Sequence, residues 1–261
     1  MTPTPFFQVD AFAGKPFEGN PAAVMPLTQW LPDATLQAIA AENNLSETAF
    51  TVSSERDDAD YDLRWFTPTV EVDLCGHATI ASGHVLIHGA AVRFATRSGI
   101  LTVSRDGDLL RLDLPAHFVE EGVEPGLLDA LGLPADTPTL LGRSGNGSAI
   151  AILADEAAVR AVTPDFAALR TIDRLVIVTA PGDETAVTSR VFAAYHGIDE
   201  DPVTGAAHAA LVPFWAMRLG RDRFSAFQAS KRGGHLDCEL REDRVLLGGH
   251  CVTVIEGHFQ L

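Results

Sequence analysis

The pattern of apolar and polar positions divides the chain into many short strands and a few helices. Residues 61–66 alternate in character and predict a strand, whereas apolar residues spaced for one face of a helix predict a helix that begins near Pro32 and ends near Asn43. The β-branched and aromatic residues after Glu47 predict a strand, which places Glu47 at a helix-to-strand junction. Further strands are expected over 6–12, 22–25, 149–153, 175–180 and 190–193, hairpin turns at 98–99 and 106–107, short helices over 127–131, 155–162 and 164–169, and successive strands from 224 to 261.

Two stretches rich in small residues each predict a loop that leads into a helix. Residues 74–83 read Leu-Cys-Gly-His-Ala-Thr-Ile-Ala-Ser-Gly, and residues 197–211 place an acidic, proline-containing segment before Gly-Ala-Ala-His-Ala-Ala-Leu. A helix start can hold an anion through its unpaired N–H groups and its dipole. We expect the first helix to stop at Gly89, and the second to kink or restart at Pro213, because an interior proline costs about 3 kcal/mol.

The two loop-to-helix stretches also share what precedes them. A strand-like Arg-x-Phe stands before each one, at residues 64–66 and 190–192. Superposing Gly76 on Gly205 sets His77 against Ala206. This similarity indicates a weak internal repeat, with two pseudo-equivalent lobes that each aim a helix start at a shared cleft. Two ordinary, unrelated loop-to-helix connections remain the alternative.

The mixture of short strands and small-residue helices favours an α+β fold over a doubly wound parallel sheet. A chain of 261 residues allows one large domain or two of ordinary size. We expect an N-terminal lobe over 1–116 and a C-terminal lobe over 117–249, joined by an acidic linker at 117–125. A strand at about 250–261 can return to the first lobe.

Composition excludes several classes of partner. The 19 Lys and Arg residues stand against 35 Asp and Glu residues, a formal net charge of −16, which would repel nucleic acids and anionic membranes. The three cysteines, Cys75, Cys238 and Cys251, give neither a disulfide framework nor paired metal-ligand spacing. No leader-like segment and no apolar run of spanning length is present, so a cytoplasmic location is expected.

Three residues are candidates for chemistry. Glu47 stands in an otherwise uncharged run, where burial would suit a general acid or base; a surface carboxylate at a helix end is the alternative. His77, at a helix start, is expected to stay neutral and to exchange hydrogen bonds with a substrate oxygen, or else to serve only as a cap. Asp201 could orient a proton or hold a substrate amine, or stabilise its helix through the dipole alone.

Other groups of residues give weaker evidence of a chemical function. His84 and His88 are four residues apart on a predicted helix, but no third ligand has clear spacing, so we assign no metal site. The chain contains no Gly-x-Ser-x-Gly nucleophile elbow and no phosphate-binding Lys-Ser/Thr pair.

Motifs in register over nearly the whole chain resemble the PhzF-like family, named for a phenazine-biosynthesis isomerase within the diaminopimelate epimerase-like superfamily. The matching segments are Val9–Phe12 with Gly19–Val24, Ser46–Phe50, Arg64–Pro68 with Glu71-Val72, Cys75–Thr79, Asp201–Gly205, and Gln228–Ser230 with Arg232–Gly234.

The resemblance implies two lobes, each a curved mixed β-sheet wrapped around a central helix, with the site between them. It also implies a homodimer and no cofactor. The two helix starts, which bring no Lys or Arg of their own, predict a small carboxylate-bearing substrate. By resemblance, Glu47 transfers the proton. The residues assigned to substrate binding are Asn20, Gly76, His77, Asp201, Gly205 and Ala206.

Two departures leave the substrate open. Ala206 stands where the phenazine enzyme's pattern has Ser, and Cys75 stands where that enzyme has Ala. A cofactor-independent isomerase that transfers a proton through Glu47 is our first hypothesis. A two-base racemase or epimerase using Cys75 is the second, although the loop around Asp201 supplies no opposing thiol. A non-catalytic metabolite-binding protein is the third.

Overall fold

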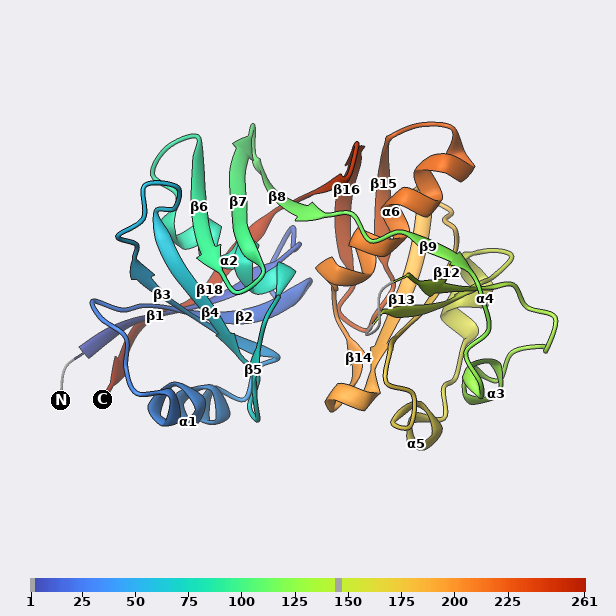
Figure 1. Cartoon of the computed structure of the whole chain (residues 1–261), viewed down its shortest axis with the longest axis horizontal. Helices are drawn as coiled ribbons and strands as arrows, with labels where there is room; N and C mark the ends of the chain where they lie inside the picture. Colours follow the sequence, from blue (N-terminus) through green and yellow to red (C-terminus); the bar gives the residue numbers. More distant parts are fainter. Residues whose placement is uncertain (1–2, 144–146) are drawn as a thin grey trace. The chain divides into compact units, whose positions relative to one another are not determined.

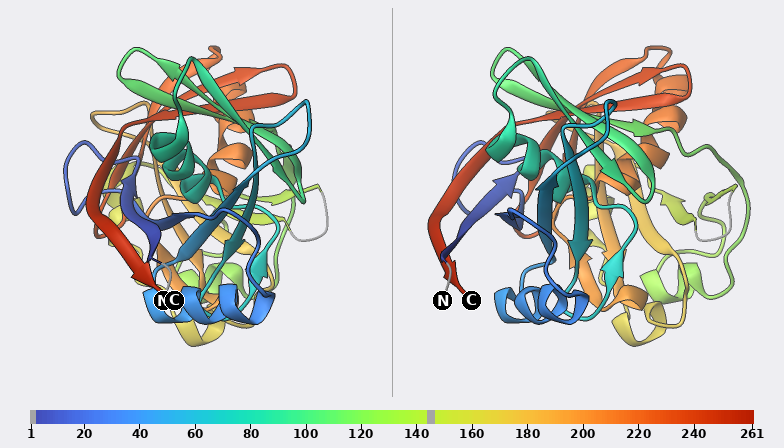
Figure 2. Two further views of the ribbon diagram at one scale, coloured as in Figure 1. Left: turned by 90° about the vertical axis from the view of Figure 1, so that its left-hand side faces the viewer. Right: turned by 60° about the vertical axis from the view of Figure 1, so that its left-hand side comes forward.

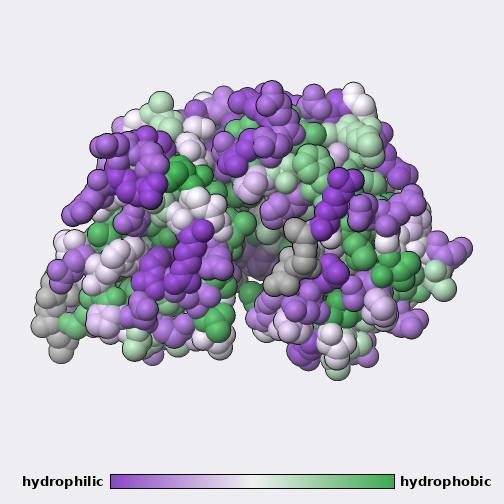
Figure 3. Space-filling model, in the orientation of Figure 1, coloured by the Kyte–Doolittle hydropathy of each residue, from purple (hydrophilic) through white to green (hydrophobic). Residues whose placement is uncertain are grey.

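The computed structural model describes residues 3–143 and 147–261, which form two compact units. Unit 1 comprises the chain up to Leu114 together with Gly248–Leu261, and unit 2 comprises Pro115–Leu247. Among the described residues, no helix has the length and apolar character needed to cross a membrane. Hydrophilic residues cover much of the face drawn in Figure 3.

Unit 1 is a mixed sheet around one small-residue helix (Figure 1). Its strands pair in the order β18-β1-β2-β3-β4-β6-β7-β8, with β2–β3 and β4–β6 parallel and the other pairs antiparallel. Helix α2 packs on β1, β2, β3, β7 and β18. The elements are β1 (Pro3–Ala11), β2 (Asn20–Pro26), α1 (Asp33–Asn43), β3 (Glu47–Ser53), β4 (Tyr61–Phe66), β5 (Glu71–Val72), α2 (Gly76–Leu86), β6 (Ala91–Thr96), β7 (Gly99–Asp106), β8 (Leu109–Pro115) and β18 (Cys251–Gln260).

Small residues are what allow α2 to lie so close to the strands. A Cβ on Gly83 would come within 2.5 Å of a Val103 methyl on β7, so this position accepts only glycine without a shift. Strand β18 closes the unit by pairing antiparallel with β1 over its whole length, and Figure 2 shows the start of β1 beside the end of β18.

Unit 2 repeats the strand pairing of unit 1. Its order is β9-β10-β11-β12-β13-β15-β16, with β11–β12 and β13–β15 parallel and the rest antiparallel. The series parallel, antiparallel, parallel, antiparallel thus runs from β2 to β7 and again from β11 to β16. The elements are β9 (Val119–Glu121), α3 (Leu127–Leu131), β10 (Thr139–Gly142), β11 (Ser148–Ile152), α4 (Glu156–Ala161), α5 (Phe166–Leu169), β12 (Leu175–Pro181), β13 (Val187–Ala193), η1 (Ala194–His196), β14 (Ile198–Asp201), α6 (Gly205–Leu219), β15 (Arg223–Gln228), β16 (Gly234–Arg241) and β17 (Arg244–Gly249).

The Arg-x-Phe segments form the same structure in both units. Arg64 on β4 makes a two-pronged ion pair with Glu71 on β5, with N–O distances of 2.7 and 2.8 Å. Arg190 on β13 pairs with Glu200 on β14 at 2.8 and 3.1 Å. Each guanidinium also lies 5.1 Å from the ring of its own Phe, Phe66 or Phe192. The pairs fix the short strands that lead into α2 and α6.

Helix α6 continues through Pro213 as one helix, so the predicted restart is wrong, and the alternative of a kink stays a prediction. Proline has no N–H, so the carbonyl of Ala209, four residues earlier, loses its helical partner. The backbone N–H of His117 donates to that carbonyl at 2.9 Å and replaces the missing hydrogen bond. A neighbouring segment, which no local pattern in the helix reveals, therefore removes part of the proline's cost.

Other boundaries differ in smaller ways. Helix α2 ends at Leu86, before Gly89, because buried Ile87 already takes an extended conformation. The hairpin turns fall at 97–98 and 107–108, one residue from the expected positions. The expected linker at 117–125 contains a paired strand, β9, because its backbone bonds with β10.

Candidate functional site

Glu47 is the first residue of β3, after the left-handed residue Asn44 has ended α1. It lies beside Ala22 in the parallel pairing of β2 and β3. Its side chain is 12% exposed, so the carboxylate is held in a largely dry position.

Asn20 is brought to the same place by a tight turn. Gly19 has φ +64°, and a Cβ there would lie 2.1 Å from the carbonyl oxygen of Ala11, so only glycine fits. Strand β2 then begins at Asn20, which is fully buried.

His77, the second residue of α2, lies between these two side chains. Its Nδ1 is 3.2 Å from the amide Nδ2 of Asn20 and 3.5 Å from the Sγ of Cys75. Its Nε2 is 3.1 Å from Oε2 of Glu47. Nδ1 of His77 therefore faces an amide nitrogen and a thiol, and Nε2 faces the carboxylate of Glu47.

The contact between Glu47 and His77 is close but incompletely satisfied. Although the two atoms are 3.1 Å apart, neither Glu47 Oε2 nor His77 Nε2 has a hydrogen bond of acceptable geometry among the described residues. Buried polar atoms without such a bond are uncommon and costly, and they concentrate at functional sites. Glu47 and His77 thus form a close, buried contact between a carboxylate and an imidazole.

The pKa values of this cluster differ from what the sequence predicted for His77. Burial by itself lowers the pKa of His77, but Cys75 and Glu47 raise it, and the net direction is upward. This upward direction, which comes from the neighbouring Cys75 and Glu47, runs against the expectation of a histidine kept neutral at the helix start. Burial and the charge of Glu47 raise the pKa of the Cys75 thiol to about 11, so this thiol is protonated near neutral pH.

In unit 2, Asp201, Gly205 and Ala206 lie together at the start of α6. Asp201 is buried and accepts a short hydrogen bond from the hydroxyl of Thr204. Gln228 of β15 holds both ends of this loop. Its Nε2 donates to the carbonyl of Asp201 at 2.7 Å, and its Oε1 accepts from the N–H of Thr204 at 2.9 Å. Ser230 adds a hydrogen bond to the carbonyl of Pro202 at 2.8 Å.

The two helix starts are built alike. The N-cap residues, Cys75 and Thr204, are both extended, and neither makes a side-chain capping hydrogen bond. In each helix a side chain four residues on donates back to the N-cap carbonyl, Thr79 at 2.5 Å and His208 at 2.9 Å. Burial lowers the pKa of His208 to about 4, so it is a neutral structural donor.

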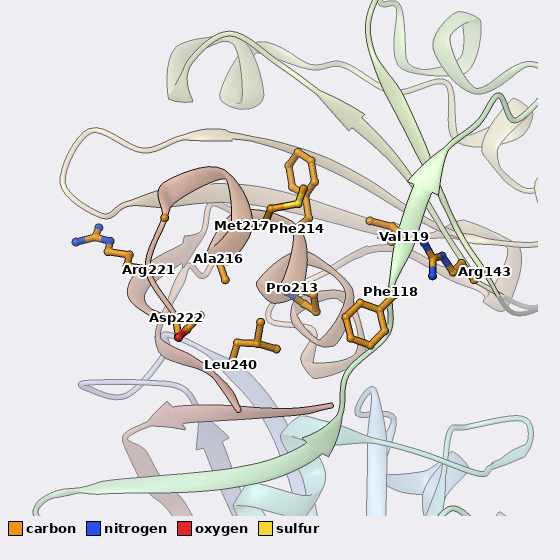
Figure 4. Close-up of a pocket in the computed structure, with 11 residues that line it drawn as sticks. Phe118, Val119, Arg143, Pro213, Phe214, Ala216, Met217, Arg221, Asp222 and Leu240 are labelled. Atoms are coloured by element: carbon orange, nitrogen blue, oxygen red, sulfur yellow. The ribbon is translucent and has the colours of Figure 1, made fainter. Parts of the chain in front are cut away.

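A separate pocket of about 630 Å³ lies against the second half of α6 (Figure 4). Apolar side chains including Phe118, Phe214 and Met217 form its walls, with Arg143 and Asp222 at its edges. It contains none of the site residues predicted from the sequence.

The potential metal ligands that lie close together in the structure do not include His84 or His88. His84 Nε2 lies 3.0 Å from Oγ1 of Thr253, and His84 and His88 do not form a ligand group. Within residues 3–143 and 147–261, the group of three potential ligands consists of Glu47, Cys75 and His77.

Comparison with known proteins agrees with this architecture. Residues 9–257 match the family model described as phenazine biosynthesis-like protein. An uncharacterized isomerase of Pseudomonas aeruginosa is 50% identical over 262 residues, covering 98% of each chain. A crystal structure of a PhzF-family protein from Enterococcus faecalis has a TM-score of 0.91 and 44% identity, covering 100% of both chains. A hydroxyproline epimerase from Agrobacterium vitis, 12% identical with a TM-score of 0.64 over 99% of this chain and 91% of its own, shares the fold.

The fold is α+β and is the one seen in that epimerase. The chain belongs to the phenazine biosynthesis-like (PhzF) family and is an isomerase.

Sequence reasoning missed several residues that hold the site. Gln228 and Ser230 were noted only as part of a matching segment, and Thr79 and His208 were not singled out. The internal repeat carried a usable signal, since Thr79 and His208 occupy the same position after Gly76 and Gly205. The contact of Cys75 with His77 had no such signal, because it depends on side-chain orientation.

Proposed function

We propose that this protein is a cofactor-independent isomerase that moves a proton on a small carboxylate-bearing metabolite, with Glu47 as the transferring group. One observation carries the proposal: Glu47 Oε2 and His77 Nε2 are buried, 3.1 Å apart, and without a well-formed hydrogen bond among the described residues. A carboxylate in that state can accept a proton from carbon and return it.

The roles of the two residues follow from their atoms. The Glu47 carboxylate would remove a proton from a carbon next to a carbonyl or carboxylate and then deliver it to another carbon of the same molecule. His77 carries a proton on Nε2, at the atom that faces Glu47. That N–H would stabilise the negative charge that develops on a substrate oxygen as the C–H bond breaks. Asn20 and Cys75, both near Nδ1, would hold the ring in this orientation.

The start of α2 favours an anionic substrate. The first-turn N–H groups of Gly76 and His77 lie beside the acid–base pair, and the N-cap Cys75 does not cap them with its side chain. A helix start carries about half a positive elementary charge, which would bind a carboxylate in a poorly solvated position. We propose separately that Asp201, Gly205 and Ala206 belong to a substrate-binding surface of unit 2.

The chemistry of Cys75 argues against the two-base alternative. A thiol base must ionise, and a thiol whose pKa is raised to about 11 is almost entirely protonated near neutral pH. The corresponding residue of unit 2 is Thr204, which has no thiol to act as the second base.

The test is a screen of carboxylate metabolites with the purified protein in deuterated water, followed by NMR and polarimetry. Deuterium incorporation or a moved double bond with retained configuration is the expected result. Loss of optical activity would instead support the racemase. Binding without exchange for any compound would favour a metabolite-binding protein and contradict the proposal.

A further inference from the structure

Trp65, on β4, is almost fully buried, yet its indole N–H makes no hydrogen bond. The residue is 1% exposed, and among residues 3–143 and 147–261 its Nε1 has no acceptor. An indole N–H can only donate, and a buried tryptophan usually finds an acceptor for it. A buried donor without an acceptor costs free energy, so this group calls for an explanation.

The alternation of side chains along β4 fixes the side of the sheet on which Trp65 lies. Its two neighbours lie on the side of α1. Arg64 pairs with Asp33 of α1 at 2.9 Å, and Phe66 belongs to the same hydrophobic cluster as Leu36 of α1. Successive side chains of a strand point to opposite faces, so Trp65 points away from α1.

The register of β3 against β4 places Trp65 beside the proposed acid–base group. Trp65 stands opposite Ala49, and Glu47 is two residues from Ala49, so Trp65 and Glu47 share a face. Such diagonal neighbours lie about 7–8 Å apart, which is within reach of an aromatic side chain. Glu47 contacts His77 of α2 at 3.1 Å, so α2 covers this face. The indole and the acid–base pair thus lie on one interior side of unit 1.

The protein does not use the nearby hydroxyl on this face as an acceptor. Thr51 follows on the same side of β3, and its Oγ1 also lacks a hydrogen bond among the described residues. In unit 2 the equivalent residue is Thr179, whose Oγ1 accepts from Nε1 of the buried Trp215 at 3.0 Å. The fold therefore provides an acceptor for a buried indole in unit 2 and leaves the donor of Trp65 available.

We propose that the indole N–H of Trp65 donates a hydrogen bond to a carboxylate oxygen of the bound substrate. This assignment deepens the proposed function and rests on it, because it takes the side of Glu47 and His77 as the substrate site. A hydrogen bond to an ionised acceptor is stronger than one between neutral groups. The uncharged indole would therefore add to anion binding at the start of α2 without placing a further charge in a buried position.

Trp65→Phe tests this role, because it keeps an aromatic ring and removes the N–H. With a substrate found by the exchange screen, kcat/KM should fall by about 10- to 100-fold. The loss should appear mainly in KM, since the bond is present before and during the reaction. Trp215→Phe is the matched control: it should keep kcat/KM within about twofold but lose more stability in urea, because it breaks the bond to Thr179. An unchanged KM in Trp65→Phe would overturn the assignment.

NMR of the ¹⁵N-labelled wild-type protein tests the same bond without an activity assay. The three tryptophans give three indole N–H signals, and Trp30→Phe and Trp215→Phe identify the third as Trp65. Acetate, succinate and malate are the probes. At least one should shift the Trp65 signal downfield in a saturable manner and leave the Trp215 signal in place.

A Trp65 signal that none of the three probes moves would overturn the assignment. A saturable shift in a protein that shows no deuterium exchange would instead leave the assignment standing and contradict the proposed proton transfer. The two proposals therefore fail separately.

Discussion

The starts of α2 and α6 share a scaffold but differ in chemistry. Both follow a β-strand whose arginine pairs with a glutamate and lies over a phenylalanine, and both have an extended, uncapped N-cap residue. Across the strand pairs, Phe66 faces Thr48 and Phe192 faces Val176. Glu47 therefore corresponds to Leu175, one residue earlier.

The difference is confined to the side chains at equivalent positions. Unit 1 has Glu47 and His77 where unit 2 has Leu175 and Ala206. Unit 2 instead binds its loop with Gln228, which bonds to Asp201 and Thr204. One backbone plan thus holds the proposed acid–base pair in one unit and a hydrogen-bonded loop in the other, so the proposed chemistry belongs to side chains placed on the fold and not to the fold itself.

The largest expected effect comes from removing the acid–base group that unit 2 lacks. Glu47→Gln keeps the shape and eliminates the base, so turnover should fall by about 10² to 10⁴. The measurement is the initial rate with a substrate found by the exchange screen. Glu42→Gln, on the exposed face of α1, is the control and should keep the wild-type rate. A near-normal rate in Glu47→Gln would remove Glu47 from its role.

The second effect concerns the stability of the protein in acid. In unit 2, the ring of His208 donates to the backbone carbonyl of Thr204. The pKa of His208 is about 4 in the fold, below the ordinary 6.5, so the unfolded chain binds the proton more tightly. Neutral, buried His208 therefore makes its full contribution to the free energy of unfolding above pH 6.5. As the pH falls toward 4, the unfolded chain gains the proton and the free energy of unfolding decreases by about 3 kcal/mol.

His208→Asn supplies an amide N–H in place of the ring and does not titrate. Urea denaturation at pH 7 and at pH 4.5 should show a smaller loss for this variant than for the wild type. Equal losses would mean that His208 does not contribute to acid sensitivity. Thr79, its counterpart in unit 1, does not titrate in this range, so no such term arises there.

The third effect comes from giving position 77 of unit 1 the residue that unit 2 has at the equivalent position. His77→Ala reproduces Ala206 and should lower turnover by about 10², the cost of one hydrogen-bond donor to a developing charge. His84→Ala, on the same helix and beside Thr253, should leave the rate nearly unchanged. Because His77 is proposed to act on the bound substrate, the loss should fall mainly on kcat and less on KM.

The fourth effect tests the shared scaffold. Arg64→Gln and Arg190→Gln each break a partly buried pair, with side-chain exposures of 20% and 13%, and each should lower the free energy of unfolding by about 2 kcal/mol. Urea denaturation followed by circular dichroism gives both values. Closely similar losses are expected if the two strands are equivalent, and a loss in only one variant would contradict that equivalence.

The smallest effect is expected at Cys75. Since its thiol is protonated near neutral pH, Cys75→Ala should lose less than about tenfold in turnover. An inactive Cys75→Ala, together with inactivation of the wild type by one equivalent of an alkylating reagent at Cys75, would restore the two-base hypothesis.

The sequence by itself determined most of the local structure and the identity of the motifs. Alternation predicted strand 61–66, and the β-branched run placed Glu47 at the start of a strand, as β4 and β3 show. The family resemblance and the α+β class, drawn from motifs in register, are confirmed. These features depend on spacing and short segments, which a sequence displays directly.

Tertiary structure alone decided which of these residues meet. Asn20, Glu47 and His77 are far apart in sequence, and the register of β2 against β3 and the packing of α2 bring them together. The same packing places Cys75 and Glu47 beside His77, and both raise its pKa against the expectation from its helix position. Pro213 remained inside α6 because His117 supplies the hydrogen bond that a proline-containing helix lacks. In each case the deciding partner is distant along the chain, so no local pattern could contain it.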